Sequence, residues 1–170
     1  MDEEMAAVRR FMEQFREAEH AAYRAWLLEA DFDRFAKKRD ALMRLGAAIP
    51  FSSTMPRWRD DPLPPPDEAE QTLRTEYAPR RLLRLEAHTL PDGRRVYAAF
   101  VSGTHTIRTT GRPPSSVAEC YIVARGEAGW QIISRRSAPN PAFPYWETTG
   151  GEDIALPETP DAVLELEDEE

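Results

Sequence analysis

The fold is decided by the stretch Val117-Ala-Glu-Cys-Tyr-Ile-Val-Ala-Arg125, which is followed by Gly126-Glu-Ala-Gly129 and then by Trp130-Gln-Ile-Ile-Ser-Arg-Arg136. Two β-branched and aromatic runs separated by a short loop with glycines predict a β-hairpin. Side chains alternate along a strand, so one face of the first run is small and apolar: Ala118, Cys120, Ile122 and Ala124. On the second run we expect Trp130 and Ile132 to be core residues.

Two further strands are predicted immediately before this hairpin. Residues 81–89 are predicted to be a strand and residues 95–102 its partner, and Leu90-Pro-Asp-Gly93 between them is typical of a tight turn. The second strand is expected to continue over residues 104–109, with a bulge at Gly103.

The N-terminal part of the chain predicts two helices that cover one face of the sheet. An apolar stripe at helical spacing runs through residues 3–30. A second helix is expected over residues 34–45, with Asp31 or Asp33 as its N-cap. Its predicted inner residues are Phe35, Leu42 and Leu45.

Prolines then interrupt regular structure over residues 47–66, and a short helix is expected to begin at Asp67. The order of helices followed by antiparallel strands indicates an α+β fold class. A chain of 170 residues with 41% hydrophobic and 31% charged residues is expected to form one soluble domain. That domain is predicted to span residues 1–150.

Charge is unevenly distributed along the chain, whose net charge is −8. Residues 152–170 carry nine acids and no base, whereas residues 72–136 carry a net charge of +6. We therefore expect residues 151–170 to be an acidic, disordered tail. No apolar run approaches the ~20 residues of a membrane span, and the acidic N-terminus does not resemble a secretion signal, so a cytoplasmic location is expected.

Three segments give the chain a resemblance to the NTF2-like superfamily. They are the helix joint Glu29-Ala-Asp-Phe-Asp-Arg-Phe35, the paired strands 81–89 and 95–109, and the closing hairpin 118–125 with Gly129-Trp-Gln-Ile-Ile-Ser134. The resemblance implies a cone in which a bent sheet wraps a helical hairpin and encloses a pocket. Tyr77-Ala-Pro-Arg-Arg-Leu-Leu-Arg84 is also similar to a pattern of the NTF2-fold immunity proteins of bacterial toxin systems.

The resemblance leaves two functions open, because one fold serves many activities. The first is a non-catalytic bacterial protein of the immunity or adaptor type, which binds and neutralises or delivers a partner protein such as a toxin or secreted effector. The alternative is a small-molecule-binding protein or a SnoaL-like or ketosteroid-isomerase-like enzyme with a pocket inside the cone.

Candidate site residues follow from these two functions. Arginine and tryptophan are frequent interface anchors, so the predicted partner-binding residues are Arg57, Trp58, Arg59, Arg80, Arg81, Arg94 and Arg95. A further hypothesis is that acids of the tail lie over these arginines when the partner is absent. If the chain is an enzyme, the pocket candidates are His88, His105, Glu119 and Tyr97. Two interpretations of the histidines stay open: they face one another on neighbouring strands, or they are exposed residues near the strand ends. Glu119 has a simpler interpretation as the ion-pair partner of Arg135 or Arg136.

Other ligand classes have little support in the sequence. One cysteine and three scattered histidines give no metal-ligand spacing, and no phosphate loop or catalytic triad is recognisable, so no metal and no cofactor are expected. Nucleic-acid binding is disfavoured because the acidic tail opposes it. The expected partner is another protein, without a membrane, and a homodimer through the sheet is a further expectation.

Overall fold

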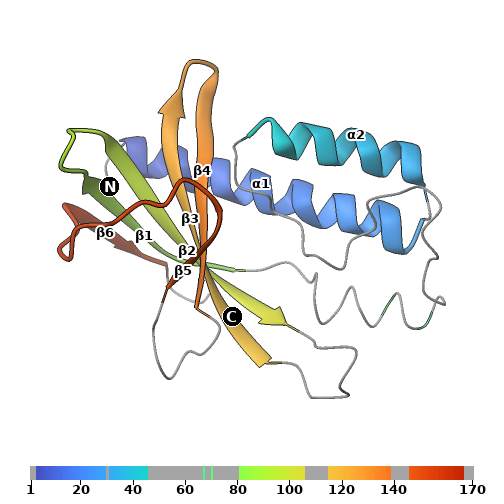
Figure 1. The fold of residues 1–170 in the computed structure, drawn as a ribbon. Helices are drawn as coiled ribbons and strands as arrows, with labels where there is room; N and C mark the ends of the chain where they lie inside the picture. The colour runs from blue at the N-terminus through green and yellow to red at the C-terminus, as the bar shows by residue number, and fades with distance from the viewer. Residues whose placement is uncertain are drawn as a thin grey trace.

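The computed structural model describes residues 3–29, 31–45, 67, 70, 81–105, 115–138 and 146–166. These residues form two helices and six strands (Figure 1). The helices are α1 (Glu3–Leu27) and α2 (Phe32–Met43). The strands are β1 (Leu82–Thr89), β2 (Arg95–His105), β3 (Ser115–Gly126), β4 (Gly129–Ala138), β5 (Glu147–Gly151) and β6 (Ala162–Glu165). The predicted α+β class is therefore confirmed.

The helices form where the sequence pattern predicts them. The apolar stripe of α1 is buried through Met5, Val8, Met12, Phe15 and Ala22. Helix α2 begins after Asp31, whose carboxylate accepts a hydrogen bond from the Arg34 backbone N–H at 3.0 Å, as expected of an N-cap. Its predicted inner residues Phe35 and Leu42 are buried.

The described strands form one antiparallel sheet in the order β5-β4-β3-β2-β1-β6. Both predicted hairpins, β1–β2 and β3–β4, are confirmed. The bulge expected at Gly103 is wrong, because Gly103 pairs with Val117 in an unbroken register between β2 and β3. Glycine weakens a strand interior and often marks a bulge, but it does not prevent regular pairing.

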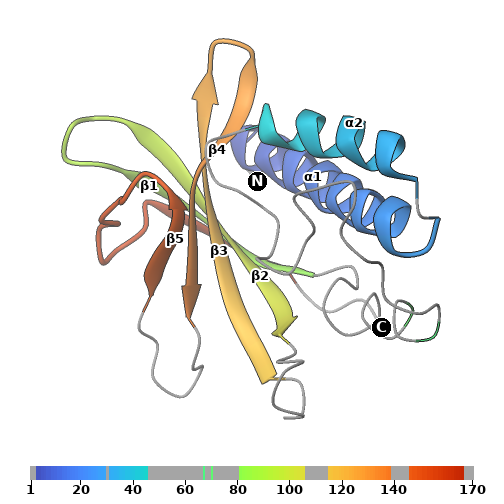
Figure 2. The same ribbon diagram turned by 45° about the vertical axis from the view of Figure 1, so that its right-hand side comes forward.

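Each face of the sheet has its own apolar core. Facing the helices, Leu85, Tyr97, Val123 and Ile132 pack with the α1 stripe. On the opposite face, the alternation predicted for β3 buries a second set with residues of neighbouring segments: Leu90, Val96, Ala98, Cys120, Ile122 and Ile154. The chain after β5 covers this second core, so helices and C-terminal segment lie on opposite sides of the sheet (Figure 2).

The expectation of a disordered tail from residue 151 is wrong for residues 151–166. Strand β5 lies at one edge of the sheet and β6 at the other. Residues 152–161 therefore cross the face between these two edges, and β6 then pairs with β1. We call residues 152–166 the C-terminal strap. Residues 167–170 lie outside the described residues.

Two features of the strap outweigh its acidic composition. Ile154 is 5% exposed, and Leu156, Leu164 and Leu166 are partly buried. Three acids of the strap form ion pairs with arginines of the β1–β2 hairpin. Glu152 pairs with Arg94, Asp161 with Arg95 and Glu165 with Arg84, at N–O distances of 3.1, 2.8 and 2.6 Å. The composition of the strap shows its negative charges but not the arginines elsewhere in the chain that pair with them.

Several expectations concern residues outside the described part of the chain. They are the proline-rich loop 47–66, with Arg57, Trp58 and Arg59, and Arg80 before β1. Among the described residues, no helix is long and apolar enough to cross a membrane.

Candidate functional site

Four side chains form a row at the end of the sheet where the β1–β2 and β3–β4 hairpins turn. They are Arg95, Tyr97, Arg125 and Trp130, and we call them the arginine–aromatic row. Arg95 and Tyr97 share a face of β2 because they are two residues apart. Arg125 is opposite Trp130 across the β3–β4 pair. Since Tyr97 belongs to the core under the helices, the row lies on the helix side of the sheet.

The rings and guanidinium groups of the row stack on one another. The rings of Tyr97 and Trp130 meet edge to face, with centroids 5.6 Å apart at an interplanar angle of 89°. The guanidinium carbon of Arg95 is 5.7 Å from the Tyr97 centroid, and that of Arg125 is 5.2 Å from the Trp130 centroid. These are cation–π distances, so each ring holds an arginine in a fixed place at the surface.

The arginines of the row are accessible to solvent, whereas the rings on which they stack are buried or half-buried. The Arg125 side chain is 70% exposed and the Arg95 side chain 38%. Tyr97 is buried and Trp130 is half-buried. Burial, followed by the hydrogen bond to Glu4, raises the pKa of Tyr97, which therefore keeps its proton and acts as a donor.

Carboxylates meet the polar groups of the row from two other elements. Glu4, in the first turn of α1, accepts a hydrogen bond from the Tyr97 hydroxyl and lies 3.8 Å from Arg125 Nη1. Asp161 of the C-terminal strap accepts hydrogen bonds from Arg95 Nη1 and from Thr89 Oγ1, both at 2.8 Å. In the folded chain, carboxylates of other segments therefore bind the polar groups of the row.

The structure describes three of the predicted partner-binding arginines. Arg95 joins the row, and Arg81 is exposed just before β1. Arg94 binds Asp92 at 3.2 Å and Glu152 at 3.1 Å. The hydrogen bond to Glu152 raises the pKa of Arg94, and the Arg94 backbone N–H lowers the pKa of Asp92. Two strap acids thus form ion pairs with predicted partner arginines, and masking of a partner site by the tail stays a hypothesis.

The four pocket candidates are not brought together. His88 is 2% exposed on the sheet face away from the helices, with its Nε2 2.9 Å from Glu86 Oε1. Tyr97 lies on the helix side. The expectation that His88 and His105 face one another is wrong, because His88 is opposite Val96 at the start of β2, whereas His105 ends that strand.

Glu119 has a different described partner from the one expected. It accepts a hydrogen bond from the Tyr121 hydroxyl at 3.1 Å. Arg136 is opposite Cys120, on the other face of the sheet, and Arg135 Nε donates to Thr149 Oγ1 at 3.1 Å. Burial raises the pKa of the Cys120 thiol to about 12, so this cysteine is a protonated core residue.

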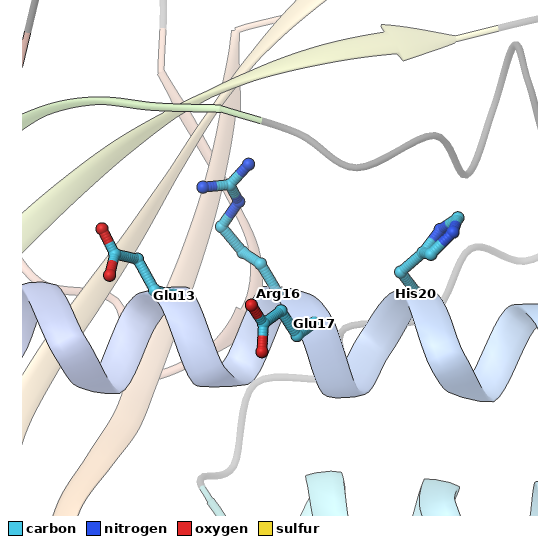
Figure 3. A pocket seen from close by; sticks show the side chains of 4 residues that line it. All are labelled: Glu13, Arg16, Glu17 and His20. Carbon is cyan, nitrogen blue, oxygen red and sulfur yellow. The ribbon is translucent and has the colours of Figure 1, made fainter. Parts of the chain in front are cut away.

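A cavity of about 470 Å³ opens beside α1, lined by Glu13, Arg16, Glu17 and His20 (Figure 3). Their spacing puts them on one stripe of the helix. Figure 3 shows Arg16 extending from the helix toward the strands, between Glu13 and His20. The helical pattern of the sequence shows that these four polar residues lie off the apolar stripe. It does not show whether they line a cavity or face open solvent. Among the described residues, no group of three potential metal ligands is present.

Sequence reasoning predicted Arg95 as a site residue and missed Arg125 and Glu4. The signal for Arg125 was present, since the hairpin prediction already places it opposite Trp130 across the turn. Glu4 carries no such signal, because only tertiary packing brings the start of α1 beside Tyr97. Comparisons with protein-family models, curated proteins and solved structures find no match to this chain.

Proposed function

We propose that this chain is a non-catalytic binding protein that recognises another protein through the arginine–aromatic row. The observation that carries the proposal is the stacking of two accessible arginines on two aromatic rings at 5.7 and 5.2 Å. Arginine, tyrosine and tryptophan dominate the energetics of protein interfaces. An arginine already held on a ring also loses little conformational freedom when a partner binds.

The kind of binding protein follows from the fold that we propose. Two helices on one face of an antiparallel sheet are consistent with an NTF2-like cone. Within that superfamily, the Tyr77–Arg84 pattern favours the bacterial immunity or adaptor type, whose role is to neutralise or deliver a partner such as a toxin or secreted effector. On this proposal the partner is a protein.

Affinity capture with matched arginine variants tests the proposal. Arg39 of α2 is the control, because its guanidinium carbon lies 5.6 Å from the Phe35 centroid in the same kind of stack, away from the row. Capture from the source cells should retain one protein on the parent chain and on Arg39→Ala, and lose it on Arg125→Ala. Equal retention by both variants would refute a binding role for the row.

The cavity beside α1 favours a second candidate function, the binding of a small polar molecule. Its volume of about 470 Å³ is within the range of about 300–1,000 Å³ usual for ligand sites. A guanidinium and an imidazole bind anions, and two carboxylates bind amines or hydroxyl groups. A SnoaL-like or isomerase-like enzyme would use this cavity, with His20 or a glutamate as the proton-transfer group. A metabolite that raises the melting temperature of the parent, but not of Arg16→Gln, would support it.

A further inference from the structure

We infer that the partner surface recognised by the arginine–aromatic row is acidic, and that Asp161 of the C-terminal strap competes with it for Arg95. This inference rests on the proposed function, and it adds the chemistry of the partner and a built-in competitor. It follows from what already occupies the row within the chain.

Carboxylates occupy both ends of the row in the folded chain. Asp161 Oδ2 lies 2.8 Å from Arg95 Nη1, and Glu4 Oε1 lies 3.8 Å from Arg125 Nη1. They come from the C-terminal strap and from α1, which lie at opposite ends of the sequence. A planar guanidinium presents donors that match a carboxylate, so the row is suited to aspartate or glutamate side chains of a partner.

The contact made by Asp161 is of a kind that a partner can replace. The Arg95 and Asp161 side chains are 38% and 45% exposed, and an ion pair this accessible contributes little to stability because solvent screens it. The strap does not need this pair to stay in place. The Asp161 backbone N–H donates to Ala87 at 2.7 Å, and Ile154 is buried in the core under the strap.

A second strap acid provides a matched control for the competition. Glu165 binds Arg84 at 2.6 Å on β1, outside the row. Asp161→Asn and Glu165→Gln each remove one negative charge and one ion pair from the strap. Only the first of these changes removes an ion pair from an arginine of the row.

The test measures binding of a fluorescent polyglutamate peptide to the full chain, with a polyglutamine peptide of equal length as reference. Asp161→Asn should bind polyglutamate roughly two- to five-fold more tightly than the parent, as expected from loss of an exposed competing pair. Glu165→Gln should match the parent, and Arg95→Gln should bind more weakly. Melting temperatures verify that each variant is folded.

Three results would overturn the inference: equal gains in Asp161→Asn and Glu165→Gln, no gain in either, or unchanged binding by Arg95→Gln. If the capture of a partner protein is still lost in Arg125→Ala, the proposed function survives any of them. The row then binds a partner of different chemistry. Loss of that capture difference, with polyglutamate behaving as expected, would instead refute the proposed function and leave an acid-binding surface.

Discussion

The guanidinium carbon of Arg125 lies 5.2 Å from the centroid of the Trp130 ring, across the turn of the β3–β4 hairpin. The Trp130 ring in turn packs edge to face with the Tyr97 ring, and the Arg95 guanidinium stacks on Tyr97. The pairing of β3 with β4 thus places an exposed arginine beside aromatic rings that pack on the apolar core. Substitutions in this region should therefore separate stability from binding.

Ile132 and Trp130 should differ in their contribution to stability. Ile132 is 1% exposed, so Ile132→Ala should cost about 2–5 kcal/mol of unfolding free energy. Trp130 is only half-buried, so Trp130→Ala should cost less than the about 3–5 kcal/mol of a fully buried aromatic residue. Chemical denaturation measures both values. An unchanged midpoint for Ile132→Ala would show that the inner face of β4 is assigned wrongly.

The C-terminal strap should contribute to stability through Ile154. Ile154 is buried against Val96, Cys120 and Ile122, so Ile154→Ala should cost about 2–5 kcal/mol. Val163, which is 43% exposed on the same strap, is the control, and Val163→Ala should stay within about 0.5 kcal/mol of the parent. If Ile154→Ala were equally neutral, the second core would not be formed in solution.

Gly151, the last residue of β5 before the strap, should tolerate substitution less than Gly93. Its φ is +75°, and a Cβ there would lie 2.2 Å from the Ile133 carbonyl oxygen. Gly93 also has a positive φ of +92°, but a Cβ there meets nothing within 4 Å. Gly93→Ala should therefore cost about 1–2 kcal/mol from the backbone conformation alone, and Gly151→Ala distinctly more. Equal melting temperatures of the two variants would contradict the path of the strap.

Alkaline pH should destabilise the folded chain through Cys120 and Tyr97. Burial raises the pKa of Cys120 from 9.0 to about 12 and also raises the pKa of Tyr97 above 10.0. The unfolded chain therefore releases these protons first, and rising pH favours unfolding. The stability contributed by Cys120 is complete below pH 9 and is lost as the pH rises toward 12.

Urea denaturation at a series of pH values above neutrality measures this loss. Cys120→Ala is the informative variant, because it removes one of the two titrating groups. Its stability should decline less steeply with pH than that of the parent. Parallel curves for the two proteins would show that the thiol is not shielded from water.

Local sequence signals predicted the helices and hairpins, and long-range pairing explains what they missed. The turn at Gly93 and the alternation of β3 depend on neighbouring residues, so they can be read directly from the chain. The strap depends on pairs such as Arg84 with Glu165, which are 81 positions apart. From composition alone, the five acids of the strap resemble those of a solvated tail.

The candidate site shows the same division. The identity of Arg95 and the placement of Arg125 opposite Trp130 follow from strand spacing and hairpin register. The meeting of Tyr97 with Glu4 requires α1 to pack across β2, which no local pattern encodes. The cavity-lining stripe of α1 has the spacing of an ordinary solvent-exposed face, so only the structure distinguishes it.

The affinity of the captured partner protein for Arg125→Ala and Arg39→Ala tests the role of the row most directly. Both substitutions remove an arginine stacked on an aromatic ring, and only Arg125 belongs to the row. Titration calorimetry should show binding weakened at least about tenfold for Arg125→Ala, as for an interface anchor, and unchanged for Arg39→Ala. Equal affinities of the two variants for the partner would contradict recognition through the arginine–aromatic row.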